Sequence, residues 1–282
     1  MKPLLMLVAT PLGNPGDLSP RAREALEEAD LVLVEDTRRA GSQFKRWGLR
    51  VQRMLSFFEH NEQARTDQVL AELKDGARVA LMSDAGAPCV ADPGYQLVRA
   101  CQQESIPVTP IPGPSAVICA LMASGLPAHP FTFLGFLPRK PSERNRTLAP
   151  FAEIKTTLVF FERKNRVLDA LHAAHELLGN RDFCLARELT KTHEQFILGQ
   201  LGDLSDVDPE LKGEVTVVIG PPEAGLRTEA AQAKALMRQY LDRGIKAKEA
   251  ARQVREKTTG WSAKELYALA VEQGNGDIPD GE

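Results

Sequence analysis

Short apolar runs alternate with longer polar stretches along the first 111 residues. Runs that are apolar throughout are typical of strands buried on both faces of a sheet. Five such runs predict strands, at Leu4–Thr10, Leu31–Glu35, Val51–Phe57, Arg78–Ser83 and Ile106–Ile111. Helices are predicted between them, one beginning after Ser19 with Pro20 at its first position, another covering Glu62–Lys74. Strands alternating with helices predict a mainly parallel sheet with helices on both faces.

The pattern changes after residue 113. Further strand-like runs follow at Phe131–Leu137, Thr157–Glu162, Phe183–Glu188, Glu194–Leu198 and Glu214–Gly220. One clear long helical pattern, Val167–Leu178, lies among them, so we expect a mixed sheet with antiparallel pairs. The predicted fold class is therefore α/β, with one α/β domain over residues 1–113 and a second, α+β domain over residues 114–222.

The last part of the chain differs again. Residues 221–225 have the composition of a linker. Three helical patterns follow, near 229–243, 247–257 and 262–273. Residues 228–275 hold 9 Lys and Arg against 6 Asp and Glu, a balance of +3, whereas residues 276–282 carry −3. We expect a small basic helical module at 228–275 and an acidic tail at 276–282.

Composition limits the classes of protein that need considering. With 35 Lys and Arg against 38 Asp and Glu, the net charge of −3 excludes a uniformly basic nucleic-acid binder but not a local basic patch. The four cysteines include no C-x-x-C pair, which argues against a zinc ribbon and favours reduced thiols in a cytoplasmic protein. Residues 105–138 lack charged side chains, but seven prolines interrupt them, so we expect a buried helix near 115–126 and no membrane span.

Polar side chains gather where predicted strands end, which is where open parallel sheets bind ligands. Loop 83–94 carries Asp84, the better candidate for a ligand contact, and Asp92, which we interpret as a cap of the next helix. Ser115 begins an apolar helix and is expected to cap it, to contact the same ligand, or both. Loop 10–17 has glycines at 13 and 16 only, so it lacks the dinucleotide-binding fingerprint.

Several ordered motifs carry a resemblance to a known family. They are VATPLGNPGD, VEDTRR, FFEHNE, SDAGAPCVADPG and PIPGPSAV, followed by Leu189–Thr192, Gly213–Val215 and Lys264–Tyr267. The chain resembles the tetrapyrrole methylase superfamily and, within it, the ribosomal RNA small subunit methyltransferase I family, over about residues 4–269. The resemblance implies two tetrapyrrole-methylase-type domains that form a homodimer. It also implies S-adenosyl-L-methionine-dependent 2′-O-methylation of a cytidine ribose in small-subunit (16S) ribosomal RNA.

The family places the cofactor in a cleft between the two α/β domains. Carried over by motif, the cofactor-binding residues are Pro11, Leu12, Ser83, Asp84, Ala85, Gly86, Val90, Ser115, Ala116, Phe161, Glu162, Arg187 and Thr216. Hydroxyl and carboxylate groups suit the amino-acid end of the cofactor, and carbonyl-rich turns suit its sulfonium cation.

A ribose hydroxyl attacks only when its proton has an acceptor. The charged ends of the second and third strands supply the candidate catalytic residues Asp36, Arg38, His60 and Asn61. Either Asp36 or His60 is a possible base, and the choice stays open. Arg38 is also suited to hold a flanking phosphate.

Two basic segments are candidate RNA contacts. The first follows the sixth strand and holds Arg139, Lys140, Arg144 and Arg146; the second lies in the helical module and holds Lys246, Lys248, Arg252, Arg255 and Lys257. Phosphate contacts of this kind position RNA without reading its sequence. His172 and His175 lie three residues apart on a leucine-rich helix and favour a solvated pair, so we expect no metal site.

Three other functions remain open at this point. The first is a methyltransferase acting on a corrinoid or porphyrinoid ring, and the second is a non-catalytic RNA-binding factor in ribosome assembly. The third and weakest is a nicotinamide-dependent oxidoreductase. The favoured partner is ribosomal RNA or the small ribosomal subunit, with no membrane partner.

Overall fold

A computed structural model describes residues 3–211, 213–222, 228, 230–255, 257, 258, 261 and 263–274, with the side chains of 264 and 270–274 excepted. The chain divides into two units, Met1–Pro221 and Pro222–Glu282, each of which has its own core. Among the described residues, no helix combines the length and the apolar character needed to cross a membrane. The expected acidic tail at 276–282 lies outside the described residues.

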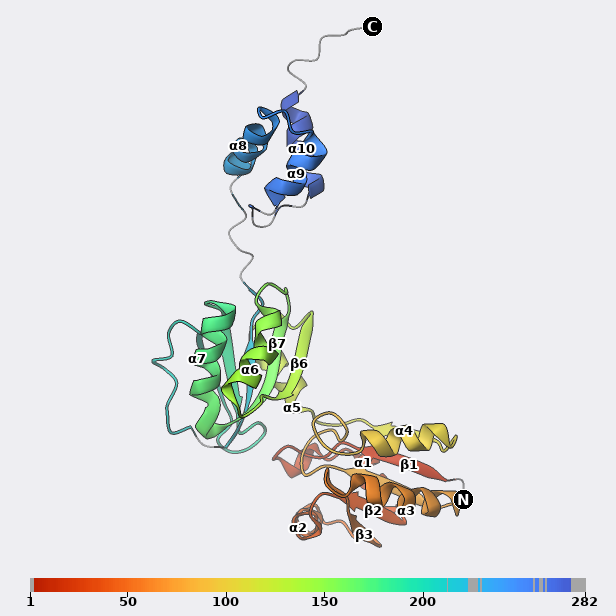
Figure 1. The fold of residues 1–282 in the computed structure, drawn as a ribbon. Coiled ribbons are helices and arrows are strands. Elements are labelled where there is room, and N and C mark those ends of the chain that lie inside the picture. Colours follow the sequence, from red (N-terminus) through yellow and green to blue (C-terminus); the bar gives the residue numbers. More distant parts are fainter. Residues whose placement is uncertain are drawn as a thin grey trace. The chain divides into compact units, whose positions relative to one another are not determined.

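The first sheet is wholly parallel (Figure 1). Its strands are β1 (Leu4–Val8), β2 (Leu31–Val34), β3 (Met54–Ser56), β4 (Arg78–Met82) and β5 (Val108–Ile111). They run in the order β3-β2-β4-β1-β5, so the three inner strands β2, β4 and β1 are paired on both edges. All five predicted strands are confirmed, and β3 is shorter than expected. The sheet is parallel because each crossover contains a helix or a long loop.

Helices cover both faces of this sheet. They are α1 (Pro20–Glu27), α2 (Thr37–Trp47), α3 (Glu62–Lys74) and α4 (Tyr95–Gln103). Alternate strand residues enter two separate cores: Val32 and Ala80 pack with α1 and α2, whereas Leu33 and Val79 pack with α3 and α4. Both faces of the strands are therefore buried, as their unbroken apolar runs indicate.

The second sheet is mixed. Its strands are β6 (Phe131–Phe136), β7 (Thr157–Arg163), β8 (Asp182–Arg187), β9 (Gln195–Gln200) and β10 (Glu214–Ile219). In the order β6-β7-β10-β8-β9, only β6 and β7 are parallel, and the other pairs are antiparallel. The expected mixed sheet is thus confirmed. Arg181 is buried beside it and donates hydrogen bonds to four backbone carbonyls, those of Phe151, Ala152, Leu178 and Gly220.

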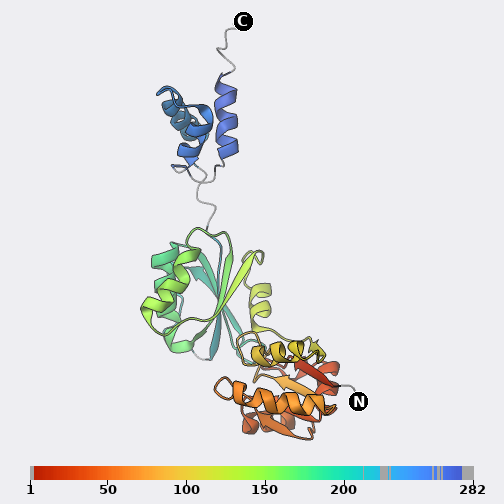
Figure 2. The same ribbon diagram turned by 45° about the vertical axis from the view of Figure 1, so that its right-hand side comes forward.

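Helices flank the second sheet on both sides (Figure 2). They are α5 (Ala116–Ala123) on one side, and α6 (Pro141–Leu148) and α7 (Val167–Leu178) on the other. The sequence did not predict α6. It predicted α5 as a buried helix, but Ile118 and Met122 are 46% and 81% exposed. An apolar composition alone does not show how many sides of a helix are covered.

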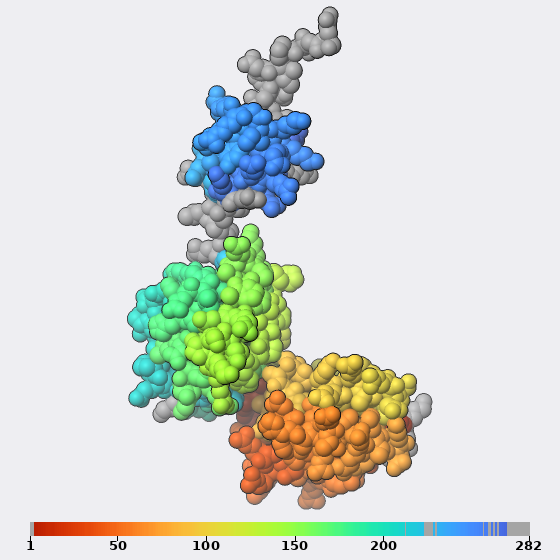
Figure 3. All heavy atoms as spheres, viewed as in Figure 1, coloured from red at the N-terminus to blue at the C-terminus, as the bar shows by residue number. Residues whose placement is uncertain are grey.

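The second unit contains α8 (Ala230–Leu241), α9 (Ala247–Arg255) and α10 (Ala263–Gly274), which form one body in the space-filling view (Figure 3). Met237 of α8, Val254 of α9 and Leu266 of α10 meet in its core. The Lys257 ammonium lies 5.4 Å from the centre of the Tyr240 ring. The three predicted helices of the basic module are therefore present.

Candidate active site

Two loops at the carboxyl end of the first sheet are joined by backbone hydrogen bonds. Thr10 after β1 and Gly86 after β4 exchange both N–H···O bonds, at 2.9 and 3.0 Å. The Thr10 hydroxyl also donates to the carbonyl of Ser83 at 3.2 Å. Gly86 has φ +82°, and a Cβ there would come within 3.3 Å of the Leu12 side chain. Glycine therefore allows this close approach, and the two loops form one rigid wall.

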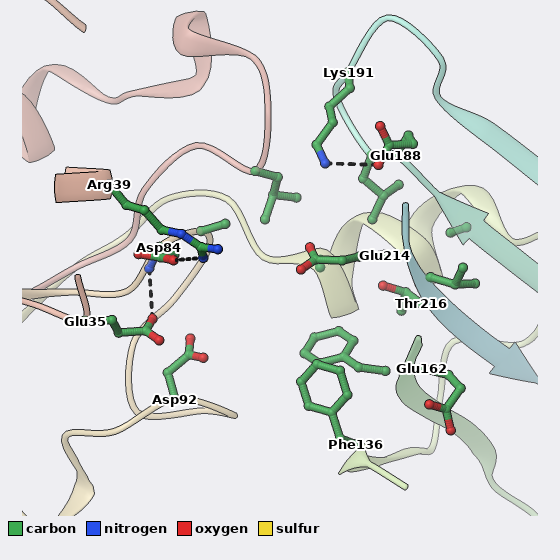
Figure 4. A pocket seen from close by; sticks show the side chains of 17 residues that line it. Glu35, Arg39, Asp84, Asp92, Phe136, Glu162, Glu188, Lys191, Glu214 and Thr216 are labelled. Atoms are coloured by element: carbon green, nitrogen blue, oxygen red, sulfur yellow. Dashed lines mark hydrogen bonds and ion pairs between the residues drawn. The ribbon is translucent and has the colours of Figure 1, made fainter. Parts of the chain in front are cut away.

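A cavity of about 280 Å³ lies in the Met1–Pro221 unit beside this wall (Figure 4). Both sheets contribute to its lining. The first sheet and its loops supply Leu12, Glu35, Arg39, Asp84, Ala85 and Asp92; the second sheet, its loops and α5 supply Ala116, Phe136, Phe161, Glu162, Ala186, Glu188, Leu189, Lys191, Glu214, Val215 and Thr216. Its volume is close to the range of small-molecule sites.

Carboxylates dominate the first wall of the cavity. Arg39 Nη1 pairs with Asp84 Oδ2 at 2.8 Å, and the Asp84 N–H donates to Glu35 Oε1 at 3.0 Å (Figure 4). Burial raises the pKa of Glu35 despite that hydrogen bond. Burial, together with the nearby Glu35, raises the pKa of Asp92 to about 6. This wall therefore favours a cation and holds one group that exchanges its proton near neutral pH.

The opposite wall combines charge with aromatic surface. Glu188 Oε1 pairs with Lys191 Nζ at 3.0 Å (Figure 4). Glu188 and Thr190 have positive φ values of +51° and +63°, a strained arrangement that clusters at functional sites. The rings of Phe136 and Phe161 lie 5.4 Å apart. A flat, partly apolar group of the size of a nucleobase is suited to such a wall.

Seven of the thirteen residues predicted to bind the cofactor line this cavity. They are Leu12, Asp84, Ala85, Ala116, Phe161, Glu162 and Thr216. Glu162 is 1% exposed, accepts a hydrogen bond from the Arg163 N–H at 2.8 Å and lies 3.2 Å from Arg166 Nη2. Burial raises the pKa of its carboxyl group.

The other six, Pro11, Ser83, Gly86, Val90, Ser115 and Arg187, are not among the lining residues. Ser83 and Gly86 belong to the rigid wall, and Val90 is 58% exposed. Ser115 stands at the N-cap of α5 without a side-chain capping hydrogen bond. Arg187 Nε donates to Gln195 Oε1 at 2.8 Å.

None of the four candidate catalytic residues lines the cavity: Asp36 and Arg38 lie at the start of α2, and His60 and Asn61 lie in the turn between β3 and α3. Asp36 caps α2, accepting hydrogen bonds from the N–H groups of Arg38 and Arg39 at 2.8 and 3.3 Å. The Arg38 side chain holds the pKa of Asp36 below its usual value. The Arg38 side chain is 92% exposed and His60 is exposed as well.

The Asn61 side chain forms hydrogen bonds within its own loop. Its Oδ1 accepts from the Phe58 N–H at 2.7 Å, and its Nδ2 donates to the Ser56 carbonyl at 3.1 Å. These bonds fix the turn between β3 and α3. Asn61 therefore shapes the loop that presents His60.

Asp92 has a different position from the one the sequence suggested. We interpreted it as the cap of α4, but α4 is capped by Glu62, whose Oε1 accepts from the Gly94 and Gln96 N–H groups at 3.0 Å each. Glu62 comes from the start of α3 and is 6% exposed. Asp92 is therefore not needed by the helix and lines the cavity instead.

The sequence reasoning missed further lining residues, among them Glu35, Arg39, Phe136, Glu188, Lys191 and Glu214. Glu35 and Arg39 belong to the VEDTRR motif, of which only Asp36 and Arg38 were named as candidate site residues. Lys191 belongs to the Leu189–Thr192 motif, to which no role was given. Glu214 belongs to the Gly213–Val215 motif, to which likewise no role was given, and nothing in the local sequence distinguishes Phe136 from other strand residues.

The candidate RNA contacts lie on two helices. Arg139 and Lys140 precede α6, and Arg144 and Arg146 are within it; Lys140 pairs with Glu143 at 3.3 Å. All five cations of the second group, Lys246, Lys248, Arg252, Arg255 and Lys257, are exposed in or beside α9. Among the residues described, no group of three or more His, Cys, Asp or Glu is placed to hold a metal ion.

Curated relatives match nearly the whole chain. The family described as Tetrapyrrole (Corrin/Porphyrin) Methylases matches residues 4–205. A protein of Mycobacterium tuberculosis (strain ATCC 25618 / H37Rv), named ribosomal RNA small subunit methyltransferase I, is 42% identical over 95% of this chain and 94% of its own length. A protein of the same name from Mesorhizobium japonicum is 41% identical over 98% of this chain and 96% of its own.

Solved structures share the fold at lower identity. Diphthine synthase superposes with a TM-score of 0.60 at 20% identity, over 77% of this chain and 90% of its own. Uroporphyrin-III-C-methyltransferase from Thermus thermophilus superposes with a TM-score of 0.55 at 23% identity, over 77% of this chain and 94% of its own length. Two sheets of this kind, the first parallel and the second mixed, are therefore a shared architecture.

Proposed function

The chain belongs to the tetrapyrrole methylase family and, within it, to the ribosomal RNA small subunit methyltransferase I family, and on that premise we propose that it methylates the ribose 2′-hydroxyl of a cytidine in small-subunit ribosomal RNA. The methyl donor is S-adenosylmethionine, which supplies an electrophilic methyl group on a sulfonium cation. The observation that carries the proposal is the carboxylate-lined cavity at the ends of the parallel strands.

The lining of the cavity fits this donor. Glu35, Asp84 and Asp92 give one wall a negative potential, which stabilises a sulfonium cation. Phe136 and Phe161 offer flat surface to the adenine ring. Ser115 is not among the lining residues, but its side chain makes no capping bond with α5, and we propose that its hydroxyl binds the amino-acid end of the donor.

RNA binding is proposed for both basic segments. The five exposed cations of the α9 segment, Lys246–Lys257, stand against an acidic remainder of the chain, and a ribose methylase must hold a polyanion. Arg139, Lys140, Arg144 and Arg146 are proposed as a second set of phosphate contacts. Arg38, which precedes the lining residue Arg39, and His60 are both exposed and are proposed to face the RNA as well.

We propose that the working form is a homodimer in the cytoplasm. Ile118 and Met122 lie one turn apart on α5, and both are exposed, which is unusual for large apolar side chains on a helix facing water. The four cysteines are free thiols, which suits a reducing compartment. Substituting Met122 by Glu should convert a dimer to monomers in light-scattering measurements, whereas a monomeric parent chain would contradict the proposal.

A methyltransferase of a porphyrinoid ring is the other activity within the family. The curated relatives that match nearly the full length carry the ribosomal RNA name, whereas the match to uroporphyrin-III-C-methyltransferase is below 25% identity and concerns the fold alone. The family match also ends at residue 205, before the basic helical unit. These observations favour the RNA substrate.

A transfer experiment tests the choice of substrate. The protein is incubated with S-adenosylmethionine carrying a labelled methyl group, together with small ribosomal subunits that lack the modification, deproteinised ribosomal RNA, or a porphyrinoid. We expect label in subunits or RNA and none in the porphyrinoid. Label in the porphyrinoid alone would replace the RNA proposal, and binding of RNA without any transfer would favour a non-catalytic assembly factor.

A further inference from the structure

The carboxylates around the cavity differ in how they are paired. Asp84 is paired with Arg39 at 2.8 Å, Glu188 with Lys191 at 3.0 Å, and Glu35 accepts the Asp84 N–H at 3.0 Å. Asp92 lines the same cavity but takes part in none of the ion pairs of the described residues. The Ser83 side chain only partly offsets the rise in the pKa of Asp92, and the Ser83 hydroxyl donates to the Ala85 carbonyl at 3.3 Å. Asp92 is thus available to a ligand in a way that Asp84 and Glu188 are not.

The backbone around Asp92 explains why it is available. A short polar side chain immediately before a helix ordinarily caps it. Here Glu62, from another helix, already binds the Gly94 and Gln96 N–H groups at the start of α4. Pro93 has no N–H to offer. With the helix end satisfied, the Asp92 carboxylate points into the cavity beside Glu35 (Figure 4).

The charged surroundings of Asp92 set its affinity for a proton. Burial is the largest cause of the raised pKa of Asp92, and the negative charges of Glu35 after β2, Asp84 after β4 and Glu214 at the start of β10 add to it. The nearest lining cations, Arg39 and Lys191, are already paired with Asp84 and Glu188. Cys89 in the same loop is a half-buried thiol whose pKa is raised to about 11, mainly by that burial, so it stays neutral. Near pH 7 Asp92 is ionised but accepts a proton readily.

We propose that Asp92 is the catalytic residue that accepts the proton of the attacking hydroxyl, an inference that rests on the proposed ribose methylation. The hydroxyl O–H bond breaks and its proton passes to the Asp92 carboxylate. The oxygen electron pair forms the new bond to the methyl carbon, and the electron pair of the broken C–S bond stays on sulfur. Carboxylate and sulfonium charges are thereby cancelled together.

The simultaneous loss of the carboxylate and sulfonium charges is the physical reason why Asp92 is suited to accept the proton. While a cation is present, it offsets the repulsion from Glu35, Asp84 and Glu214 and keeps Asp92 ionised. When the positive charge disappears, the same three carboxylates favour the protonated form of Asp92. Asp36, a candidate base on sequence grounds, lacks this coupling because Arg38 and two backbone N–H groups already stabilise its ionised form.

A binding measurement tests the inference without RNA. Calorimetry at pH 5 to 8 compares the full chain's affinities for S-adenosylmethionine, a cation at sulfur, and for S-adenosylhomocysteine, which is neutral there. We expect the ratio of the two affinities to rise several-fold with pH in the parent protein and to be independent of pH in Asp92→Asn. Asp75→Asn, at an exposed position after α3, is the matched control and should follow the parent. An unchanged pH dependence in Asp92→Asn would overturn the inference.

Turnover supplies the second readout. With the RNA that accepts the methyl group as substrate, Asp92→Asn should lower kcat by about 10²- to 10⁴-fold, as expected for the loss of a general base. The KM for RNA should change less than threefold. Asp36→Ala and His60→Ala should reduce kcat far less. Turnover of Asp92→Asn within threefold of the parent would reject the catalytic role. If the parent protein does not methylate RNA, the proposed function fails, and the affinity ratio still decides whether Asp92 faces the sulfonium.

Discussion

At the scale of single residues, the cavity concentrates negative charge that the fold itself does not require. Asp84 is fixed by Arg39 and by its own N–H to Glu35, whereas Asp92 is held near other carboxylates. Such an arrangement costs stability and is retained where a ligand supplies the missing positive charge.

Replacing Asp92 should therefore stabilise the unliganded protein. A carboxyl group with a raised pKa in the folded state destabilises the fold when ionised, so the folded protein gains stability as pH falls from about 6 toward 3.8, the ordinary value. Asp92→Asn removes that cost. Its melting temperature should exceed the parent's at pH 8, and the difference should shrink between pH 6 and pH 5. If the melting temperatures of the variant and the parent differ by the same amount at pH 8 and at pH 5, Asp92 is not the titrating group.

Asp84 should matter for binding and little for stability. Asp84→Asn removes one charge from the wall of the cavity, and we expect affinity for S-adenosylmethionine to fall about tenfold, equivalent to about 1.4 kcal/mol. Calorimetry measures this, with Asp67→Asn on the exposed side of α3 as a control. Unchanged affinity in a folded Asp84→Asn protein would exclude Asp84 from the donor site.

At the scale of elements, two buried polar side chains hold segments together. Glu62 joins the start of α3 to the start of α4, and Arg181 binds carbonyls at the end of α7, at Phe151 and Ala152, and after β10. Both are buried, so removing either leaves backbone groups without partners.

Glu62→Ala should lower the free energy of unfolding by about 1–3 kcal/mol, because it leaves the two N–H groups at the start of α4 without an acceptor. Gln63→Ala, at the exposed neighbouring position, should change it by less than about 0.5 kcal/mol. Urea denaturation of both variants provides the comparison. Equal stability of the two variants would show that Glu62 does not hold α4.

Much of the secondary structure could be predicted from the sequence. Ser19, whose hydroxyl accepts the Ala22 N–H at 3.1 Å, starts α1 as expected, and α3 and α7 have the predicted bounds. These features depend on neighbours in sequence. The role of Asp92 was misread because its local pattern matches a helix cap, and the residue that does cap α4 lies thirty positions earlier. Glu214 and Phe136 reach the cavity through strand pairing, which local sequence does not encode.

At the scale of the whole molecule, the proposed donor site and the proposed RNA contacts of α9 belong to different units of the chain. The Met1–Pro221 unit contains the cavity, and the Pro222–Glu282 unit contains the exposed cations of α9. The local excess of positive charge was readable from the sequence, because a charge count needs no structure. The sequence predicted only some of the residues that line the cavity, because the lining is assembled from both sheets.

Reversing two charges of α9 should weaken RNA binding without affecting the donor. For Lys248→Glu with Arg252→Glu, we expect a several-fold weaker affinity for ribosomal RNA and a smaller dependence on salt, by about 0.7 in the logarithmic slope for each phosphate that is no longer neutralised. Affinity for S-adenosylmethionine should stay within twofold. Arg21→Glu with Lys45→Glu, two exposed cations of the first unit, is the control. If both pairs weaken RNA binding equally, the effect is one of net charge and not of α9.

The identity of the methylated atom is the most direct test of the proposed methylation of a cytidine ribose. Small ribosomal subunits lacking the modification are treated with the protein and S-adenosylmethionine bearing a deuterated methyl group, and the RNA is digested to nucleosides for mass spectrometry. We expect the label on the ribose of cytidine, as 2′-O-methylcytidine, and we expect Asp92→Asn to form this nucleoside at least a hundred times more slowly than the parent protein. A label on a nucleobase or on another nucleoside, or no label in RNA, would rule out the proposed ribose methylation.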